Sequence, residues 1–146
     1  MGEWINHIPE PAQEYIRNRR LDEVECLVAD LSGIARGKAM PAKKFSKQAY
    51  FHLPTSIFTQ SITGDWMDDT LLNQIEPDMV LRPDYSTASA APWTGDVTLQ
   101  IIHDVYDQDN VLYPVAPRNV LKRVISLYQD LGFRPIVAPE MEFFLV

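Results

Sequence analysis

An alternating run over residues 96–106 constrains the fold of this chain more than any other feature. Val97, Leu99, Ile101, His103 and Val105 occupy every second position, and Thr98, Gln100, Ile102 and Asp104 stand between them. Because successive side chains of a strand point to opposite faces, this period predicts a half-buried β-strand. Residues 107–110 are typical of a turn, so we expect a return strand over residues 111–115.

A helix is predicted downstream of this hairpin. Pro117 suits the first helical position, and Gly132 suits the residue that follows a helix. Apolar residues recur between them at helical spacing, which forms an apolar stripe along one side of the helix. The stripe consists of Val120, Leu121, Val124, Leu127, Tyr128 and Leu131. A last strand is expected over residues 136–146.

The upstream segments complete an α+β pattern. Residues 9–20 combine helix-forming residues with a basic end, which predicts a helix. Residues 24–40 indicate a hairpin that Pro41 ends, because proline cannot donate to a strand ladder. The other expected elements are strands at 58–62 and 78–83, a loop at 64–76 and irregular chain at 84–93.

Charge and cysteine content narrow the functional classes. The net charge of −7 disfavours nucleic acid as a partner, because phosphates repel an acidic surface. No apolar run reaches the roughly 20 residues that span a membrane, and the N-terminus lacks the apolar core of a secretory signal. The single cysteine, Cys26, excludes an internal disulfide and fits the reducing cytoplasm. Its apolar neighbours predict a buried, inert thiol.

Two glutamates near the end of the sequence are the strongest candidates for chemistry. Glu140 and Glu142 are two positions apart on the expected last strand, which puts both on one face with Cβ atoms about 7 Å apart. Carboxylates this close repel each other unless water or a cation compensates. Hard divalent ions such as Mg²⁺ and Mn²⁺ prefer carboxylate oxygens. Spacing alone leaves open a metal pair or two glutamates on a solvated strand face.

Four segments resemble motifs of one enzyme family, in the same order. Residues 139–145, Pro-Glu-Met-Glu-Phe-Phe-Leu, resemble the first metal-binding strand of glutamine synthetases. Residues 30–38 look like the first hairpin of that family. Residues 78–84, Asp-Met-Val-Leu-Arg-Pro-Asp, are similar to its D-M-V-L-x-P-D segment, and residues 117–121 look like the start of its first catalytic-domain helix. Each segment alone is a weak signal, and the four in register are a strong one.

The resemblance implies a fold and a reaction. Residues 1–113 would form the β-grasp N-terminal domain of the family, and residues 114–146 the first helix and strand of its catalytic domain. Glu140 and Glu142 would each ligate one of two Mg²⁺ or Mn²⁺ ions that position ATP and glutamate for γ-phosphoryl transfer. An amine or ammonia then attacks the γ-glutamyl phosphate. Family members form stacked rings, so a homo-oligomer is expected for the parent enzyme.

One position departs from the ammonia-using members of the family. In those members an aspartate shortly after a phenylalanine binds ammonium in the neighbouring subunit, whereas here Thr59 follows Phe58. A neutral hydroxyl lacks the Coulomb attraction that holds a small cation, so we expect a larger amine as the nucleophile. The sequence is most similar to the γ-glutamylpolyamine and γ-glutamylmethylamide synthetase branch.

The candidate amine-binding residues lie on the loop that follows, at an expected subunit interface. They are Thr59, Ser61, Asp65, Asp68 and Asp69. Either the aspartates hold the distal ammonium of a diamine, or they are solvated loop acids. The three histidines, His7, His52 and His103, are too scattered for a metal site and are interpreted as ordinary surface or half-buried residues.

Three functional classes remain open. The chain is part of an ATP-dependent carboxylate–amine ligase, a stand-alone binding or regulatory module that keeps the ligase fold, or an unrelated α+β interaction domain. It ends inside an expected strand, four residues beyond Glu142, which favours a truncated ligase. We therefore expect this chain alone to be catalytically inactive.

Overall fold

The structure is a computed structural model that describes residues 2–65 and 77–145. Its elements, with η for a 3₁₀ helix, are η1 (Glu3–His7), α1 (Glu10–Ile16), β1 (Glu23–Ala29), β2 (Ala35–Pro41), α2 (Ala42–Phe45), β3 (Phe51–Pro54), η2 (Thr55–Phe58), β4 (Asp78–Pro83), η4 (Tyr85–Thr87), β5 (Ser89–Ala90), β6 (Thr98–Tyr106) and α3 (Pro117–Asp130). Among the helices in these two ranges, none has the length and apolar character that a bilayer span requires.

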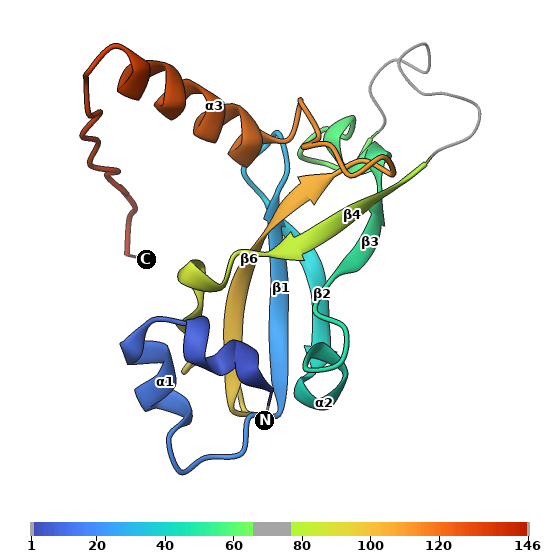
Figure 1. Cartoon of the computed structure of the whole chain (residues 1–146), viewed down its shortest axis with the longest axis vertical. Coiled ribbons are helices and arrows are strands. Elements are labelled where there is room, and N and C mark those ends of the chain that lie inside the picture. The colour runs from blue at the N-terminus through green and yellow to red at the C-terminus, as the bar shows by residue number, and fades with distance from the viewer. Residues whose placement is uncertain (1, 66–76, 146) are drawn as a thin grey trace.

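One mixed sheet organises the fold (Figure 1). Its strands follow the order β2-β1-β6-β4-β3, and β5 pairs with β6 outside this path. The two central strands, β1 and β6, are parallel, and the other pairings between these strands are antiparallel. Helices cover the sheet without alternating regularly with its strands. The predicted combination of helices with a sheet in an α+β arrangement is therefore confirmed.

The hydrophobic core lies against one face of the sheet. On β6 the alternation is confirmed, because Leu99, Ile101 and Val105 are at most 1 % exposed. Helices η1, α1 and α2 supply the opposing layer, and Figure 1 shows η1 and α1 across the lower part of the sheet. The other main contributors to the core are Trp4, Ile16, Val24, Cys26, Val28, Phe45, Phe51, Met79 and Leu81.

The turn between β1 and β2 is organised by the buried carboxylate of Asp30. Its Oδ1 accepts hydrogen bonds from the backbone N–H groups of Ser32 at 2.9 Å and Ile34 at 2.8 Å. Its Oδ2 accepts one from Arg36 Nε at 2.8 Å. Burial by itself raises the pKa of Asp30, but Arg36 and the backbone donors outweigh burial and lower the pKa below its usual value. The predicted hairpin is confirmed, and the Asp30 side chain accepts hydrogen bonds from two backbone N–H groups of its turn.

The N-terminal half differs from the predictions at two places. The helix expected over residues 9–20 ends at Ile16, because Asn18 has φ 61°, which lies outside the helical region. The strand expected over residues 58–62 is wrong, since Phe58 ends η2 and residues 59–62 contain a bend, one isolated bridge and a turn. The strand lies earlier, at β3, where it pairs antiparallel with β4.

The segments after β4 also differ in part. The stretch 84–93, expected to be irregular, contains η4 and β5. The return strand expected over residues 111–115 reduces to one bridge between Leu112 and Tyr106. The physical reason is Pro114, which has no N–H to donate, and a turn that leads directly into α3.

Helix α3 is confirmed, including its end. Gly132 has φ 78°, its N–H donates to Gln129 O at 2.9 Å, and the N–H of Phe133 donates to Tyr128 O at 2.9 Å. These two bonds form a Schellman motif, which only a residue tolerant of positive φ permits. The helix leaves the sheet at the end opposite to α1, as Figure 1 shows.

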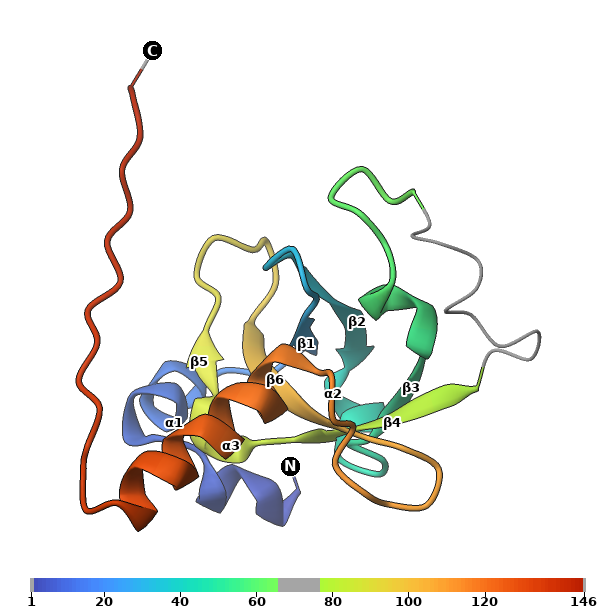
Figure 2. The same ribbon diagram turned by 90° about the horizontal axis from the view of Figure 1, so that it is seen from above.

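Residues 136–145 form neither helix nor strand, so the strand expected there is absent from the structure. A strand needs a hydrogen-bonded neighbour, and Figure 2 shows this segment running away from the sheet. Its apolar side chains are exposed, for example Ile136 at 90 % and Phe144 at 95 %. Of the loop expected at residues 64–76, only residues 64 and 65 belong to the described part of the chain.

Candidate functional site

The loop predicted to bind an amine is closed by its own polar side chains. The Ser61 N–H donates to Asp65 O at 2.8 Å, and the Asp65 N–H donates to Ser61 Oγ at 3.1 Å. Thr63 Oγ1 donates to Asp65 Oδ2 at 2.6 Å and lies 2.8 Å from Ser61 Oγ. The structure therefore brings Ser61 and Asp65 together, with an exposed carboxylate held in one orientation.

Thr59 belongs to a separate local arrangement at the end of η2. Its backbone N–H and its Oγ1 both donate to Ser56 O, at 2.9 Å and 3.0 Å. The ring of Phe58 is buried and stacks on Tyr113 at 5.8 Å, which fixes the start of the loop against the chain that enters α3. Thr59 thus keeps only acceptor capacity for a ligand, because its hydroxyl proton is already donated.

Asp68 and Asp69, the other two candidates on this loop, lie outside the described residues.

The predicted metal ligands, Glu140 and Glu142, lie on the exposed C-terminal segment. Their carboxylate oxygens are suitable donors for Mg²⁺ or Mn²⁺. Within residues 2–65 and 77–145, no group of three or more His, Cys, Asp or Glu side chains is placed to hold a metal ion. The two glutamates therefore supply a fitting but incomplete ligand set.

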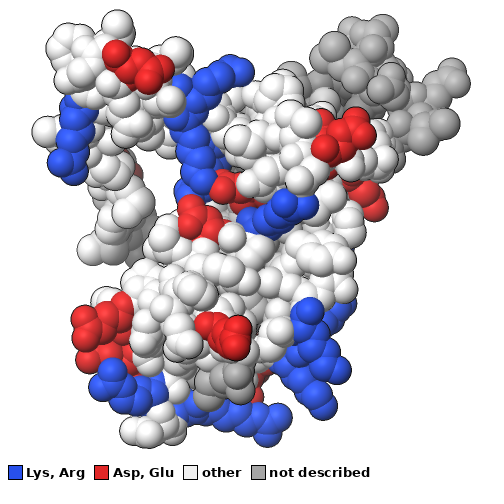
Figure 3. Space-filling view, in the orientation of Figure 1, with Lys and Arg blue, Asp and Glu red and all other residues white. Residues whose placement is uncertain are grey.

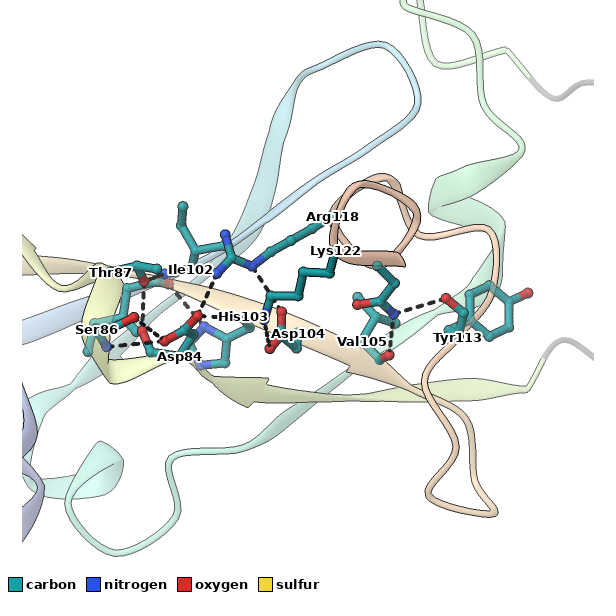
Figure 4. Close-up of polar contacts among 12 residues, drawn as sticks. Asp84, Ser86, Thr87, Ile102, His103, Asp104, Val105, Tyr113, Arg118 and Lys122 are labelled. Atoms are coloured by element: carbon teal, nitrogen blue, oxygen red, sulfur yellow. Dashed lines mark hydrogen bonds and ion pairs between the residues drawn. The ribbon is translucent and has the colours of Figure 1, made fainter. Parts of the chain in front are cut away.

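An ionic cluster that no sequence motif predicted joins α3 to the sheet (Figure 4). Arg118 bridges two carboxylates, with Nη2 2.5 Å from Asp84 Oδ2 and Nε 2.9 Å from Asp104 Oδ1. One helical turn later, Lys122 Nζ lies 2.5 Å from Asp104 Oδ2 and 3.6 Å from Asp84 Oδ2. We call these four residues the α3 clamp. Figure 3 shows basic and acidic side chains meeting where α3 leaves the sheet.

A sequence signal for the α3 clamp did exist. Asp84 is the last residue of the segment 78–84 and Arg118 is the second residue of the segment 117–121, and both segments resemble family motifs. Opposite charges in two such segments suggest a contact between them. The sequence gives no means of choosing this pair over others, because 34 residues separate the two positions.

An apolar cavity of about 340 Å³ lies beside the α3 clamp. It lies between β1, β2, β6 and the first turns of α3. Its lining residues are Leu27, Val28, Ala29, Ala35, Ile102, Pro117, Arg118 and Leu121. The first turns of α3 are therefore attached to the sheet mainly by polar contacts, beside an unfilled apolar space.

Two other candidates have structural roles. Cys26 is fully buried, so the predicted burial is confirmed; burial raises the pKa of its thiol to about 12, and its inertness stays a prediction. His103 is fully buried, where a surface or half-buried position was expected. Its ring nitrogens lie 3.0 Å from Ile101 O and 3.2 Å from Ala49 O. Burial lowers the pKa of His103 although these two carbonyls and Asp104 act in the opposite sense.

Comparison with known proteins agrees with the resemblance found in the motifs. Residues 114–146 match the glutamine synthetase catalytic domain family. Over 128 residues, or 84 % of the chain, the sequence is 34 % identical to gamma-glutamylputrescine synthetase PuuA of Escherichia coli (strain K12), of which this covers 27 %. Over 142 residues, or 92 % of the chain, it is 28 % identical to glutamate–isopropylamine ligase of a Pseudomonas species, of which this covers 30 %.

Solved structures share the fold. A crystal structure of a novel glutamine synthase homolog superposes with a TM-score of 0.66 at 18 % identity, over 77 % of this chain and 28 % of that one. A GmaS/ADP complex superposes with a TM-score of 0.60 at 21 % identity, over 84 % of this chain and 26 % of that one. The chain therefore spans less than a third of the length of each of these four proteins.

The relatives of this chain are ligases of the glutamine synthetase type. The chain belongs to the glutamine synthetase family.

Proposed function

We propose that this chain is the N-terminal portion of an ATP-dependent ligase that joins the γ-carboxyl group of glutamate to an amine. An oxygen of the γ-carboxylate attacks the γ-phosphorus of ATP, and ADP leaves. The amine nitrogen then attacks the γ-carbonyl carbon of the γ-glutamyl phosphate, phosphate leaves, and the nitrogen loses a proton. An amide bond forms at the expense of one phosphoanhydride bond.

The observation that carries the choice of an amine over ammonia is Thr59. An ammonium ion is small and fully charged, so it needs a carboxylate close by. Thr59 offers only the lone pairs of a neutral oxygen, because its hydroxyl proton is donated to Ser56 O. Two relatives with amine substrates in their names, a γ-glutamylputrescine synthetase and a glutamate–isopropylamine ligase, support the same choice.

The loop beyond Thr59 would contact the rest of the amine. The exposed carboxylate of Asp65 is oriented by Thr63 and suits the distal ammonium of a diamine. Ser61 holds the loop closed, and we propose Asp68 and Asp69 as further acidic contacts. In the assembled ligase this loop would lie at the site of a neighbouring subunit, which requires a homo-oligomer.

Glu140 and Glu142 are proposed as ligands of two divalent ions, Mg²⁺ or Mn²⁺. Such ions, when bound, offset the negative charge of the ATP phosphates and of the transferred phosphoryl group. The two side chains offer only carboxylate oxygens, which suits these ions. The described residues offer no third ligand, so we expect this chain alone to bind metal weakly and to be inactive.

The proposed architecture has two parts. Residues 1–113 would be a β-grasp-like N-terminal domain, and residues 114–146 would begin the catalytic domain, in a cytoplasmic enzyme. The central parallel pair β1–β6, flanked by antiparallel neighbours, supports the first part. The catalytic-domain match over residues 114–146 supports the second.

The test is an ATP-dependent assay of the full-length ligase with glutamate and, separately, ammonia, methylamine, ethanolamine and putrescine. We expect γ-glutamyl amides from at least one amine at a kcat/KM above that for ammonia. Thr59→Asp should shift the preference toward ammonia, since it restores the missing carboxylate. Asn6→Asp, which adds the same charge at an exposed position of η1, is the matched control and should not.

Ammonia as the preferred substrate of the wild-type ligase would overturn the proposed choice of an amine. No ATP-dependent product from any of the four nucleophiles would favour the alternative, a binding or regulatory module that retains the ligase fold.

A further inference from the structure

Two segments that resemble separate family motifs meet at one ion pair. Asp84 ends the segment 78–84, which contains β4, and Arg118 lies in the first turn of α3. Their side chains are in contact at 2.5 Å, and Asp104 on β6 contacts the same guanidinium at 2.9 Å (Figure 4). The two motif-like segments are therefore in direct contact, at a place that includes neither the proposed metal ligands nor the proposed amine loop.

Contacts other than the one with Arg118 also hold the carboxylate of Asp84 in place. Its Oδ1 accepts hydrogen bonds from the Ser86 N–H at 3.2 Å and from Ser86 Oγ at 2.6 Å, which leaves Oδ2 for Arg118. Burial raises the pKa of Asp84, but Ser86 and Arg118 together outweigh it and lower the pKa below its usual value. An acceptor with a fixed position gives the guanidinium a fixed direction.

The guanidinium of Arg118 is suited to this position because it is planar. Its Nη2 and Nε groups donate in different directions to two carboxylates, Asp104 on β6 and Asp84 just after the neighbouring strand β4. Asp84 and Asp104 carry two negative charges, and Arg118 and Lys122 carry two positive ones, so the α3 clamp is neutral. The four side chains are 14–42 % exposed, so water screens the pairs only in part.

Little else in the described residues attaches α3 to the sheet. Asn119 is the buried residue of this helix, and its Nδ2 donates to Val105 O at 2.8 Å and Tyr113 O at 2.9 Å. The apolar stripe is largely exposed, from Val124 at 41 % to Leu131 at 72 %. The direction of α3 therefore depends on polar contacts within its first two turns.

A small rotation at the α3 clamp is amplified along the helix. Helix α3 has 14 residues, so it is about 21 Å long. A tilt of about 10° at its start moves its end by about 4 Å, from the same rise per residue. The Gly132 turn then passes this displacement to the segment that carries Glu140 and Glu142. Catalysis tolerates far smaller errors, because a displacement of about 1 Å can lower a rate by about 100-fold.

We propose that Arg118 is a positioning residue that sets the angle of α3 on the sheet through Asp84 and Asp104. In this way it sets where Glu140 and Glu142 lie relative to the N-terminal domain. The second statement rests on the proposed ligase function, and the first does not.

The angle of α3 is tested by spin labels on cysteines introduced at Lys47 and Gln129, both exposed. Cys26 is fully buried and stays unlabelled. Pulsed electron–electron double resonance measures the distribution of distances between the two spin labels. Arg118→Gln should broaden or shift this distribution by about 4 Å, the displacement expected for a tilt of about 10°. Arg123→Gln removes the same charge from an exposed position of the same helix and should leave the distribution unchanged.

The Arg118→Lys variant separates the effect of bridging two carboxylates from the effect of the positive charge. Arg118→Lys keeps the positive charge but cannot donate in a plane to two carboxylates, so it should resemble Arg118→Gln. Should Arg118→Gln fail to fold, Asp84→Asn decides the question, because it weakens the same contact from the sheet side. A distribution equal to wild type in the folded variants overturns the proposal, and so does full restoration by lysine.

The consequence for catalysis has its own readout in the full-length ligase. Arg118→Gln should lower kcat at least tenfold with the KM for the amine unchanged, since no α3 clamp contact involves the amine loop. An unchanged kcat would overturn the link to Glu140 and Glu142. If the wild-type ligase makes no product, the proposed function fails, while the distance measurement still decides whether Arg118 sets the helix angle.

Discussion

Replacing Gly37 by alanine is expected to disrupt the pairing of β1 with β2. Gly37 lies opposite Leu27 in the register of this hairpin. A Cβ atom at Gly37 would lie 1.8 Å from Cys26 O and 2.9 Å from the Cys26 carbonyl carbon. Carbon and oxygen atoms without a bond between them stay above about 3 Å, so the strands must separate by more than about 1 Å.

The cost follows from the hydrogen bonds that this separation breaks. A separation of about 1 Å takes ladder bonds well beyond their usual length of about 2.9–3.0 Å. Each lost bond costs about 0.5–1.5 kcal/mol, and a backbone group left unsatisfied costs about 1–3 kcal/mol. Two groups left unsatisfied near Gly37 give a loss of about 2–6 kcal/mol, against a total of about 5–15 kcal/mol for a domain.

Gly33 in the same hairpin provides the matched control. It has φ 78°, and an added Cβ would meet nothing within 4 Å. Gly33→Ala therefore costs only the left-handed backbone penalty of about 1–2 kcal/mol. The difference between the two alanine variants isolates the close approach of the strands from the general effect of a glycine substitution.

The assay is urea unfolding followed by tryptophan fluorescence. Trp4 is buried in the core and packs edge-on against Phe45 at 4.9 Å, so its emission reports loss of the core. Because the m-value in urea is about 1–3 kcal/mol/M, Gly37→Ala should lower the urea concentration at the unfolding midpoint by about 1 M or more. A midpoint for Gly37→Ala equal to or above that for Gly33→Ala would refute the reasoning.

Two further predictions concern buried groups. Cys26, fully buried with a pKa of about 12, should react with iodoacetamide only when the protein unfolds; labelling of the native protein as fast as free cysteine would contradict this. The folded pKa of Asp30 lies below its unfolded value of about 3.9, so its stabilisation is present above that value and is lost as pH falls through the folded pKa. Urea midpoints measured against pH should fall less steeply in acid for Asp30→Asn than for wild type, and equal slopes would count against the role of Asp30.

The parts of the fold that sequence reasoning found are those with strong local patterns. The alternation along β6 and the stripe of α3 are each visible within one segment. The Gly132 turn was found because a positive φ restricts the residue type. The missed strand β3 is a four-residue edge strand whose identity depends on pairing with a distant β4.

The candidate site was predictable to a smaller extent. Ser61 and Asp65 do come together, because their contacts lie within one short loop. The pairing of Asp84 with Arg118 required knowledge of the β4–β6 register and of where α3 begins, and neither is encoded within a local window. The roles of Glu140 and Glu142 depend on groups outside their own segment, so both stay predictions.

The central claim is that Glu140 and Glu142 are metal ligands of a glutamate–amine ligase. Titration of the full-length ligase with Mn²⁺, followed by electron paramagnetic resonance, tests it directly. We expect two bound ions in the wild type and a loss of one ion, or a strong loss of affinity, in Glu140→Gln and in Glu142→Gln. Glu10→Gln, at an exposed position in α1, is the control. Wild-type stoichiometry and affinity in both glutamine variants would contradict the account.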